Sequence, residues 1–434
     1  MRHNIVPVGG GEMTYEIRAI VDIADKLKRL GLKTNMENIG DPVAKGEQIP
    51  AWMKQIVADL AMENASYGYC PTRGVLEARE FICELTNRRG KLQITPEDIL
   101  FFNGLGDAIQ KVYGSLRHES RVIVPSPTYS THSSAEAANA GQPAVTYRLD
   151  PDNHWLPDLV ELRNKVKYNP AIAGILLINP DNPTGVVYPE VVLREIVAIA
   201  REYDLFIVSD EIYHNITYNG QSTLPISDLI GDVPAIAMKG ISKEFPWPGG
   251  RSGWIEVYNA DKDPVFAKYV ACILNAKLVE VCATTLPQMA ISKMMTHPQY
   301  PVYLEERKKR YERASNIAYN TLKGVPGLKV NRTNGAFYMA VAFAEGLLNG
   351  QQSLPIANTE VRSLVENLVN TPGCAQDKRF VYYLLASTGI CTVPLTSFCT
   401  SQNGFRITLL ERDELELTRI FQTIAASVTA YLKS

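Results

Sequence analysis

Short runs of β-branched and other apolar residues alternate with helix-like stretches between about residues 95 and 260. Strands that are buried on both faces and joined by crossover helices produce such continuous apolar runs. Between two of the runs, Leu193, Ile196, Val197 and Ala200 recur at the spacing of one helical face. The pattern predicts an α/β fold, with a three-layer αβα domain built around a mainly parallel sheet. The predicted strands are Ile99–Phe102, Val122–Val124, Ile175–Ile178, Leu205–Val208, Ala235–Met238 and Trp254–Val257.

A smaller α+β domain is predicted from the change of pattern after Pro301. A charged helical segment covers residues 305–313, and strand-like pieces follow at residues 328–330 and 337–343. The residues between 345 and 380 combine loop-forming glycines and prolines with one helical stretch, and we predict no structure for them. The predicted division assigns residues 50–305 to the large domain and residues 1–49 and 306–434 to the small domain.

Composition and charge restrict the classes of partner. The chain has 434 residues, of which 46% are hydrophobic and 21% charged, as is typical of a globular protein. Its net charge of −2 and its lack of a long basic run argue against nucleic acid and anionic membranes as partners. No apolar stretch approaches the roughly 20 residues that span a bilayer, and no signal-peptide pattern is visible. We therefore expect a cytoplasmic protein that binds small molecules. The seven scattered cysteines, none of them in a CxxC pair, predict reduced thiols and no metal site.

The segment from Ile241 to Arg251 follows a predicted strand and places a lysine, prolines and paired glycines in one loop. The amine of Lys243 is able to form an imine with an aldehyde cofactor and then to carry a proton between carbon atoms. Arg251, eight residues further on, is close enough in a folded loop to bind the phosphate of the same cofactor. Taken alone, either side chain would be an ordinary surface cation.

Two further motifs follow predicted strands and suit a pyridine ring. Asp210 lies at the carboxyl end of a buried strand, where its anion would keep a pyridine nitrogen protonated. The alternative is that Asp210 caps the next helix or pairs with an arginine. The turn over residues 179–185 presents Asn182, whose amide would donate to the ring oxygen, with Tyr213 as a second donor. A plain turn without a ligand is the alternative there.

A phosphate site and a stacking residue are predicted near the first two strands. The glycine-rich stretch of residues 103–108 leads into a helix, so the main-chain N–H groups of Leu105 and Gly106 are expected to bind phosphate. Such turns also occur without a ligand. Tyr129 follows the next strand and would stack on a flat heteroaromatic ring, although a tyrosine of the core would give the same pattern.

With these motifs in order, the sequence resembles the class I/II aminotransferases, which are fold-type I enzymes that use pyridoxal 5′-phosphate (PLP). The resemblance covers nearly the whole chain. A smaller likeness, to the bacterial alanine (glutamate–pyruvate) aminotransferases, rests on residues 67–70 and 155–159. The segments that carry the family resemblance are Ile39–Pro42, Tyr69–Gly74, Asn103–Ala108, Pro125–Tyr129, Asn179–Gly185, Ser209–Tyr213, Ser242–Arg251 and Gly404–Ile407.

The resemblance implies further roles, position by position. Lys243 would be the imine-forming lysine, and Ser242 would join Arg251 on the phosphate. Tyr69 matches the tyrosine that family members lend to the neighbouring subunit's phosphate, which implies a homodimer with shared active sites. Arg406 matches the arginine that binds the substrate α-carboxylate, with help from the backbone of Gly40 and from Asn182.

The activity implied is transfer of an amino group between an L-amino acid and a 2-oxo acid in two half-reactions, through pyridoxamine phosphate. The donor would be an amino acid of the alanine, aspartate or aromatic class. A fold-type I PLP lyase or decarboxylase is the alternative, since the same lysine and aspartate serve β-elimination. A non-enzymatic PLP-sensing regulator is disfavoured, because only about forty residues precede Gly40 and they have no recognition-helix pattern.

The chain departs from the family pattern at two places. Many relatives carry a hydroxyl residue three positions before the lysine, whereas this chain has Gly240 there. The phosphate is therefore expected to depend more on Ser242 and Arg251. The segment of residues 345–380 also looks longer than in compact members of the family.

Overall fold

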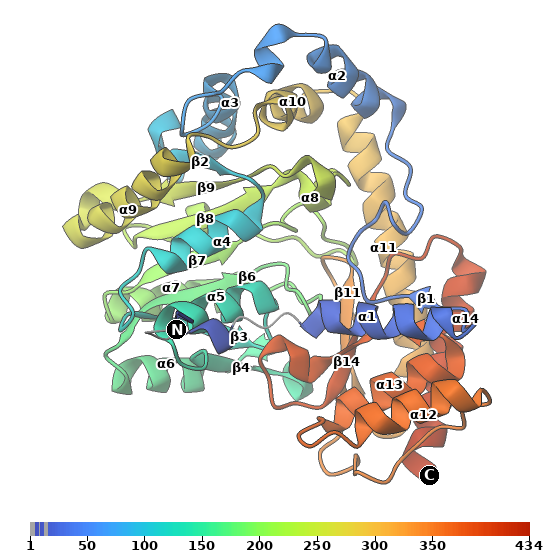
Figure 1. The fold of residues 1–434 in the computed structure, drawn as a ribbon. Coiled ribbons are helices and arrows are strands. Elements are labelled where there is room, and N and C mark those ends of the chain that lie inside the picture. Colours follow the sequence, from blue (N-terminus) through green and yellow to red (C-terminus); the bar gives the residue numbers. More distant parts are fainter. Residues whose placement is uncertain (1–4, 8, 13–15) are drawn as a thin grey trace.

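The computed structural model describes residues 5–7, 9–12 and 16–434, and its large domain is built on an eight-stranded sheet (Figure 1). Strands β8, β7, β6, β3 and β4 are parallel neighbours, β9 lies antiparallel between β2 and β8, and β5 pairs antiparallel with β4. The predicted mainly parallel sheet is confirmed. In spatial order the strands are β2 (Ile99–Phe102), β9 (Gly253–Tyr258), β8 (Ala235–Gly240), β7 (Phe206–Asp210), β6 (Ile172–Ile178), β3 (Arg121–Ser126), β4 (Thr146–Asp150) and β5 (Leu156–Pro157).

Helices cover both faces of this sheet, because its central strands bury alternate residues on opposite sides. Ile175 and Ile207 pack into a core with one set of helices, while Leu176 and Val208 pack into a core on the other face. The three-layer arrangement is therefore confirmed. The first core includes residues of α2 (Ala51–Ala61), α3 (Leu76–Asn87), α6 (Leu159–Tyr168), α7 (Glu190–Glu202) and α10 (Thr285–Met295), and the second includes residues of α4 (Leu105–Gly114), α5 (Ser130–Ala140) and α9 (Pro264–Glu280).

The predicted face of α7 is buried along its whole length, as the spacing of its apolar residues requires. Leu193, Ile196, Val197 and Ala200 are each 2% exposed or less. The strand bounds differ from prediction by a few residues. β7 begins at Phe206, one residue late, and continues through the polar pair Ser209 and Asp210 to the edge of the sheet.

A second, smaller domain has its own hydrophobic core and an antiparallel sheet in the order β10, β11, β14, β13. Helix α11 runs from beside α2 and α10 down into this domain, whose C-terminal elements fill the lower right of Figure 1. A two-stranded parallel sheet, β1 with β12, joins the N-terminal segment to the C-terminal part. The elements are α1 (Glu16–Arg29), β1 (Asn35–Met36), α11 (Tyr300–Leu322), β10 (Leu328–Val330), β11 (Tyr338–Phe343), α12 (Thr359–Val369), α13 (Gln376–Thr388), β12 (Ile390–Cys391), β13 (Val393–Pro394), β14 (Gly404–Thr408) and α14 (Glu414–Lys433).

The pairing of β1 with β12 agrees with an N-terminal segment that belongs to the small domain, although the exact division at residues 49 and 305 stays a prediction. The charged segment of residues 305–313 is part of the longer helix α11. The segment of residues 345–380, in which one helical stretch was expected without a position, contains α12 and the start of α13. Within the described part of the chain, no helix is both long and apolar enough to cross a membrane.

The turn between β6 and α7 is held by a buried carboxylate. Asp181 is fully buried, and its Oδ2 accepts hydrogen bonds from the N–H and the hydroxyl of Thr184, at 3.0 and 2.5 Å. Burial raises the pKa of Asp181 to about 7; the bonds from Thr184 oppose this rise, and the nearby charge of Asp210 adds to it. The turn that presents Asn182 therefore contains a group whose charge changes near neutral pH.

This raised pKa predicts a stability that depends on pH. The folded protein keeps the Asp181 proton up to about pH 7, whereas the unfolded chain loses it near the ordinary aspartate pKa of 3.8. The stability that comes from burying the neutral Asp181 side chain is thus present at low pH and is lost as pH rises toward 7. Asp181→Asn cannot ionise, so its free energy of unfolding relative to wild type should improve between pH 5 and pH 8. Urea denaturation at the two pH values measures this. Asp261→Asn, at an exposed site, is the control, and equal changes in both variants would contradict the prediction.

Candidate functional site

A cavity of about 450 Å³ lies where the carboxyl ends of β2, β3, β6, β7 and β8 face the small domain. Ligands of open α/β sheets bind in this position because polar side chains gather where buried strands end. The predicted site residues that line the cavity are Gly40, Leu105, Gly106, Tyr129, Asn182, Asp210, Tyr213, Ser242, Lys243, Arg251 and Arg406. Residues that were not predicted also line it, namely Val21, Asp22, Asn38, Ile39, Ile178, Ile212, Pro248 and Tyr338.

Lys243 lines this cavity. It lies on the four-residue helix α8 (Ile241–Glu244), which begins directly after β8 ends at Gly240. Its Nζ donates a hydrogen bond to the main-chain oxygen of Gly40 at 2.8 Å and lies 5.7 Å from the ring centroid of Phe337. The lysine amine therefore bridges from the large domain to the N-terminal segment that borders the same cavity.

Asp210 is held by a buried hydrogen-bond chain at the end of β7. Its Oδ1 accepts from the N–H of Ile212 at 3.1 Å, and its Oδ2 lies 3.1 Å from Nε2 of His132. His132 is fully buried, and its Nδ1 lies 3.1 Å from the hydroxyl of Tyr113. This chain orients a carboxylate that is 3% exposed and faces the cavity. Within the protein, the side chain that pairs with Asp210 is thus a histidine. The sequence had left an arginine partner or a helix cap as alternatives to a role at the pyridine nitrogen.

One end of the cavity has the features of an anion site. Leu105 and Gly106 open helix α4, whose first N–H groups have no partner within the helix. The guanidinium of Arg251 lies against this helix start, with Nη2 donating to the oxygen of Asn103 at 3.2 Å. Gly104 has φ of 82°, and a Cβ there would come within 2.3 Å of Arg251 Nη2. Ser242 lines the same cavity. These N–H, hydroxyl and guanidinium donors fit a phosphate group.

The departure at Gly240 has a structural counterpart. Gly240 pairs with Gly253 across β8 and β9, and a Cβ on Gly240 would lie 3.0 Å from the main-chain oxygen of Ser252. A hydroxyl side chain at this position would require the neighbouring backbone to shift. The expected reliance on Ser242 and Arg251 is consistent with this packing.

The other end of the cavity contains the buried guanidinium of Arg406, which is 2% exposed. Its Nη1 donates to Asn182 Oδ1 at 3.1 Å, and its Nη2 donates to the main-chain oxygen of Asn38 at 2.6 Å. The guanidinium carbon lies 4.4 Å from the ring centroid of Tyr338 and 4.7 Å from that of Phe398. A planar cation held in this way is suited to bidentate binding of a carboxylate.

Tyr338, Tyr213 and Gly40 close the space between the two ends. The hydroxyl of Tyr213 donates to that of Tyr338 at 3.4 Å, and burial raises the pKa of Tyr213 well above its ordinary value. A Cβ on Gly40 would overlap the Tyr338 hydroxyl at 1.7 Å, so a glycine is needed there. Tyr129 lies edge-on to His132, with ring centroids 6.2 Å apart.

Tyr69 is the one predicted site residue that does not line this cavity. It lies in the loop before α3 and is 87% exposed. Its assigned role was in a neighbouring subunit, so this position leaves that role as a prediction.

His132 and Tyr338 were missed because neither belongs to a motif that the sequence makes visible. His132 follows Tyr129 by three residues, and this spacing on a helix was the only available signal.

Comparisons with known proteins identify the family of the chain. The model of the family "Aminotransferase class I and II" matches residues 36–424. An uncharacterized aminotransferase of Methanocaldococcus jannaschii is 57% identical over the full length of both chains. The glutamate–pyruvate aminotransferase of Escherichia coli K12 is 32% identical over 75% of this chain and 79% of its own.

Solved structures give the same result. An alanine aminotransferase from Pyrococcus furiosus superposes with a TM-score of 0.82 at 27% identity, covering all of both chains. An aminotransferase from Escherichia coli superposes with a TM-score of 0.83 at 26% identity, covering all of this chain and 98% of its own. The chain therefore belongs to the class I and II aminotransferase family, as the order of its motifs along the sequence had indicated.

Proposed function

We propose that this aminotransferase uses PLP bound as an imine to Lys243, and that it transfers the amino group of an L-amino acid to a 2-oxo acid. The observation that carries the proposal is the convergence of Lys243, Asp210 and the anion site at Arg251 in one cavity that also contains Arg406. When bound there, PLP supplies an electron sink for the electron pair of the broken Cα–H bond. The protein supplies position, charge and proton transfer.

Each end of the cavity has a separate task in this proposal. The first N–H groups of α4, Ser242 and Arg251 hold the cofactor phosphate, while Asp210, oriented by His132, holds a proton on the pyridine nitrogen. Asn182 and Tyr213 donate to the ring oxygen, and Tyr129 covers the ring. The phosphate and the nitrogen are thus bound by groups of opposite charge, which fixes the direction of the ring in the cavity.

Arg406 binds the α-carboxylate of the substrate, with help from the backbone of Gly40. Fixing the carboxylate turns the Cα–H bond toward Lys243, which selects loss of the proton over loss of carbon dioxide. The Nζ of Lys243 would be the base that accepts that proton and the acid that later donates it. In the structure this amine donates a hydrogen bond to the main-chain oxygen of Gly40.

The substrate class and the assembly are also inferences. We infer that alanine is the first donor to test, with pyruvate and 2-oxoglutarate as acceptors, because relatives named as alanine or glutamate–pyruvate aminotransferases match this chain. Aspartate and aromatic amino acids remain candidates.

We further infer a homodimer in which Tyr69 reaches the neighbouring phosphate. Its exposure of 87%, beside the exposed Tyr67 and Met62, supports this. A cytoplasmic location stays a prediction from the sequence.

Lys243→Ala tests the assignment of the imine. The variant should lack the absorption band of the lysine-bound cofactor and should lose transamination of L-alanine, because no other amine can form the bond at this position. Absorption spectra of the purified proteins with added PLP measure the first effect. Lys268→Ala, at an exposed site on α9, is the control and should keep both band and activity. An active Lys243→Ala variant that retains the band would contradict the assignment.

Arg406→Ala tests the carboxylate site. Loss of the buried guanidinium should raise KM for the amino acid and for the 2-oxo acid alike, because both ligands carry the same carboxylate. The increase should correspond to a loss of roughly 2–5 kcal/mol of binding free energy. Steady-state kinetics with each ligand varied in turn measure this. A KM that stays at the wild-type value for both ligands would show that the carboxylate binds elsewhere.

A further inference from the structure

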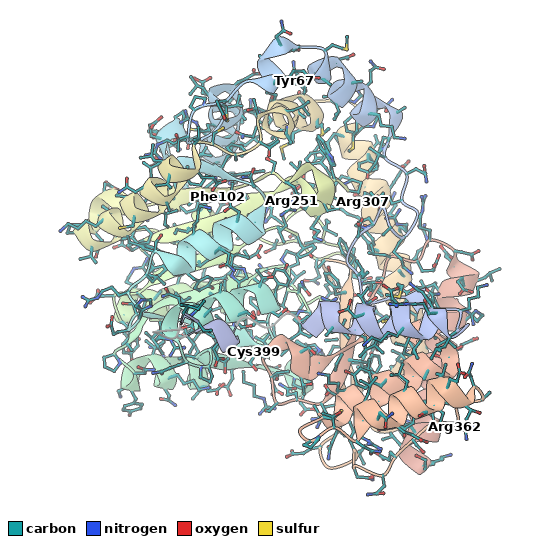
Figure 2. The ribbon with its side chains drawn as sticks, viewed as in Figure 1. Tyr67, Phe102, Arg251, Arg307, Arg362 and Cys399 are labelled. Atoms are coloured by element: carbon teal, nitrogen blue, oxygen red, sulfur yellow. The ribbon has the colours of Figure 1, made fainter. Side chains whose placement is uncertain are left out.

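A buried arginine outside the cavity contacts the backbone of the lysine helix. Arg307 of α11 is 2% exposed, and Figure 2 marks it where α11 passes close to α8. Its Nη1 donates to the main-chain oxygens of Lys243 at 2.9 Å and of Glu244 at 2.5 Å. These are the last two residues of α8, and the final carbonyl groups of a helix have no partner within it. One guanidinium nitrogen therefore donates hydrogen bonds to both final carbonyl groups of a helix that is too short to be rigid by itself.

Glu47 holds this guanidinium in place. Its Oε1 lies 2.7 Å from Nε of Arg307, and its Oε2 accepts a hydrogen bond from Nη2 of Arg310 at 2.6 Å. The hydroxyl of Tyr303 also donates to Oε1, at 3.0 Å. Burial favours the neutral acid, but the two guanidinium groups outweigh it and hold the pKa of Glu47 below its ordinary value. The carboxylate is thus charged and fully engaged in binding α11.

Glu47 and the partner of the Lys243 amine belong to the same short segment. The N–H of Glu47 donates to the oxygen of Pro42 at 2.9 Å, which closes a compact turn directly after Gly40. The oxygen of Gly40 accepts the hydrogen bond from Lys243 Nζ at 2.8 Å. Both ends of Lys243 are therefore tied to the turn of residues 40–47. The amine is tied directly, and the main-chain carbonyl is tied through Arg307 and Glu47.

We propose that Arg307, held by Glu47, is a positioning residue that sets where the amine of Lys243 lies relative to Gly40 and the cavity. Arg307 touches neither substrate nor cofactor in this account, and it acts only through the backbone of α8. The inference deepens the proposed function, because it assigns a determinant for the residue that transfers the proton. It differs from a purely stabilising role, since it requires that the reactivity of one amine depend on the Arg307 guanidinium.

Arg307→Lys is the decisive variant, because it keeps the positive charge beside Glu47 but removes the guanidinium whose Nη1 reaches two carbonyl oxygens while its Nε faces Glu47. Full-length protein freed of cofactor is treated with trinitrobenzenesulfonate, and peptide mass spectrometry gives the labelling rate of Lys243 relative to that of the exposed Lys268. We expect Lys243 to react about fivefold faster in the variant, the factor that one lost hydrogen bond to Gly40 gives. Arg313→Lys, an exposed position on the same helix, is the matched control and should leave the rate unchanged.

The cofactor-loaded enzymes give a second readout. We expect Arg307→Lys to lower kcat about tenfold or more while KM stays within about twofold, because a displaced amine slows proton transfer without removing the carboxylate site. Glu47→Gln keeps the size of the side chain but not its charge, and it should change both readouts in the same direction by a smaller factor. It also decides the question if Arg307→Lys does not fold.

The inference would be overturned if Arg307→Lys and Glu47→Gln lowered the melting temperature while Lys243 in both variants was still labelled at the wild-type rate. That result would show a role in stability alone. Because labelling is measured without cofactor, a wild-type protein that fails to take up PLP would contradict the proposed function and leave this measurement intact.

Discussion

Burial of the central sheet on both faces is the constraint on which the rest of the molecule depends. Strands β6, β7 and β8 have helices on either side, so a polar side chain within them would lose its contact with water. Polar residues are accepted where the strands end, and parallel strands end at one edge. Asp210 is the last residue of β7, whereas Asn182 and Lys243 follow the ends of β6 and β8, and the three meet because these strands are parallel neighbours.

The small domain and the N-terminal segment complete the cavity from the other side. Arg406 lies on β14, yet its guanidinium donates to the carbonyl of Asn38 and to the side chain of Asn182. Lys243 reaches in the opposite direction, to Gly40. The contacts from both domains therefore converge on the short stretch of residues 38–40, and a displacement of this stretch would disturb the lysine and the carboxylate site together.

The sequence was sufficient for the parts of the fold that depend on local pattern. Apolar runs located the central strands, and the spacing of Leu193, Ile196, Val197 and Ala200 located α7. Strand β4 was missed because Thr146–Asp150 alternates between buried and less buried residues near one edge of the sheet. The strands β12 and β13 have two residues each, and pairing with distant segments forms them, which no local pattern indicates.

The site could be predicted where its residues follow strands in recognisable motifs, and not where they come from distant segments. Lys243 and Asp210 were visible for this reason. His132 and Arg307 were not, because their importance arises from contacts with residues 78 and 64 positions away. A buried histidine and a helical arginine look like ordinary core and surface residues until the chain is folded.

The most direct test of the central claim is a single half-reaction. Purified protein loaded with PLP is mixed with L-alanine in the absence of any 2-oxo acid, and pyruvate and ammonia are measured over time. An aminotransferase should release about one pyruvate per active site and then stop, with the amino group retained until 2-oxoglutarate is added. Continuous release of carbon dioxide from L-alanine, or of ammonia from L-serine, whose β-hydroxyl is a leaving group that alanine lacks, would contradict the account and indicate a decarboxylating or eliminating enzyme on the same fold.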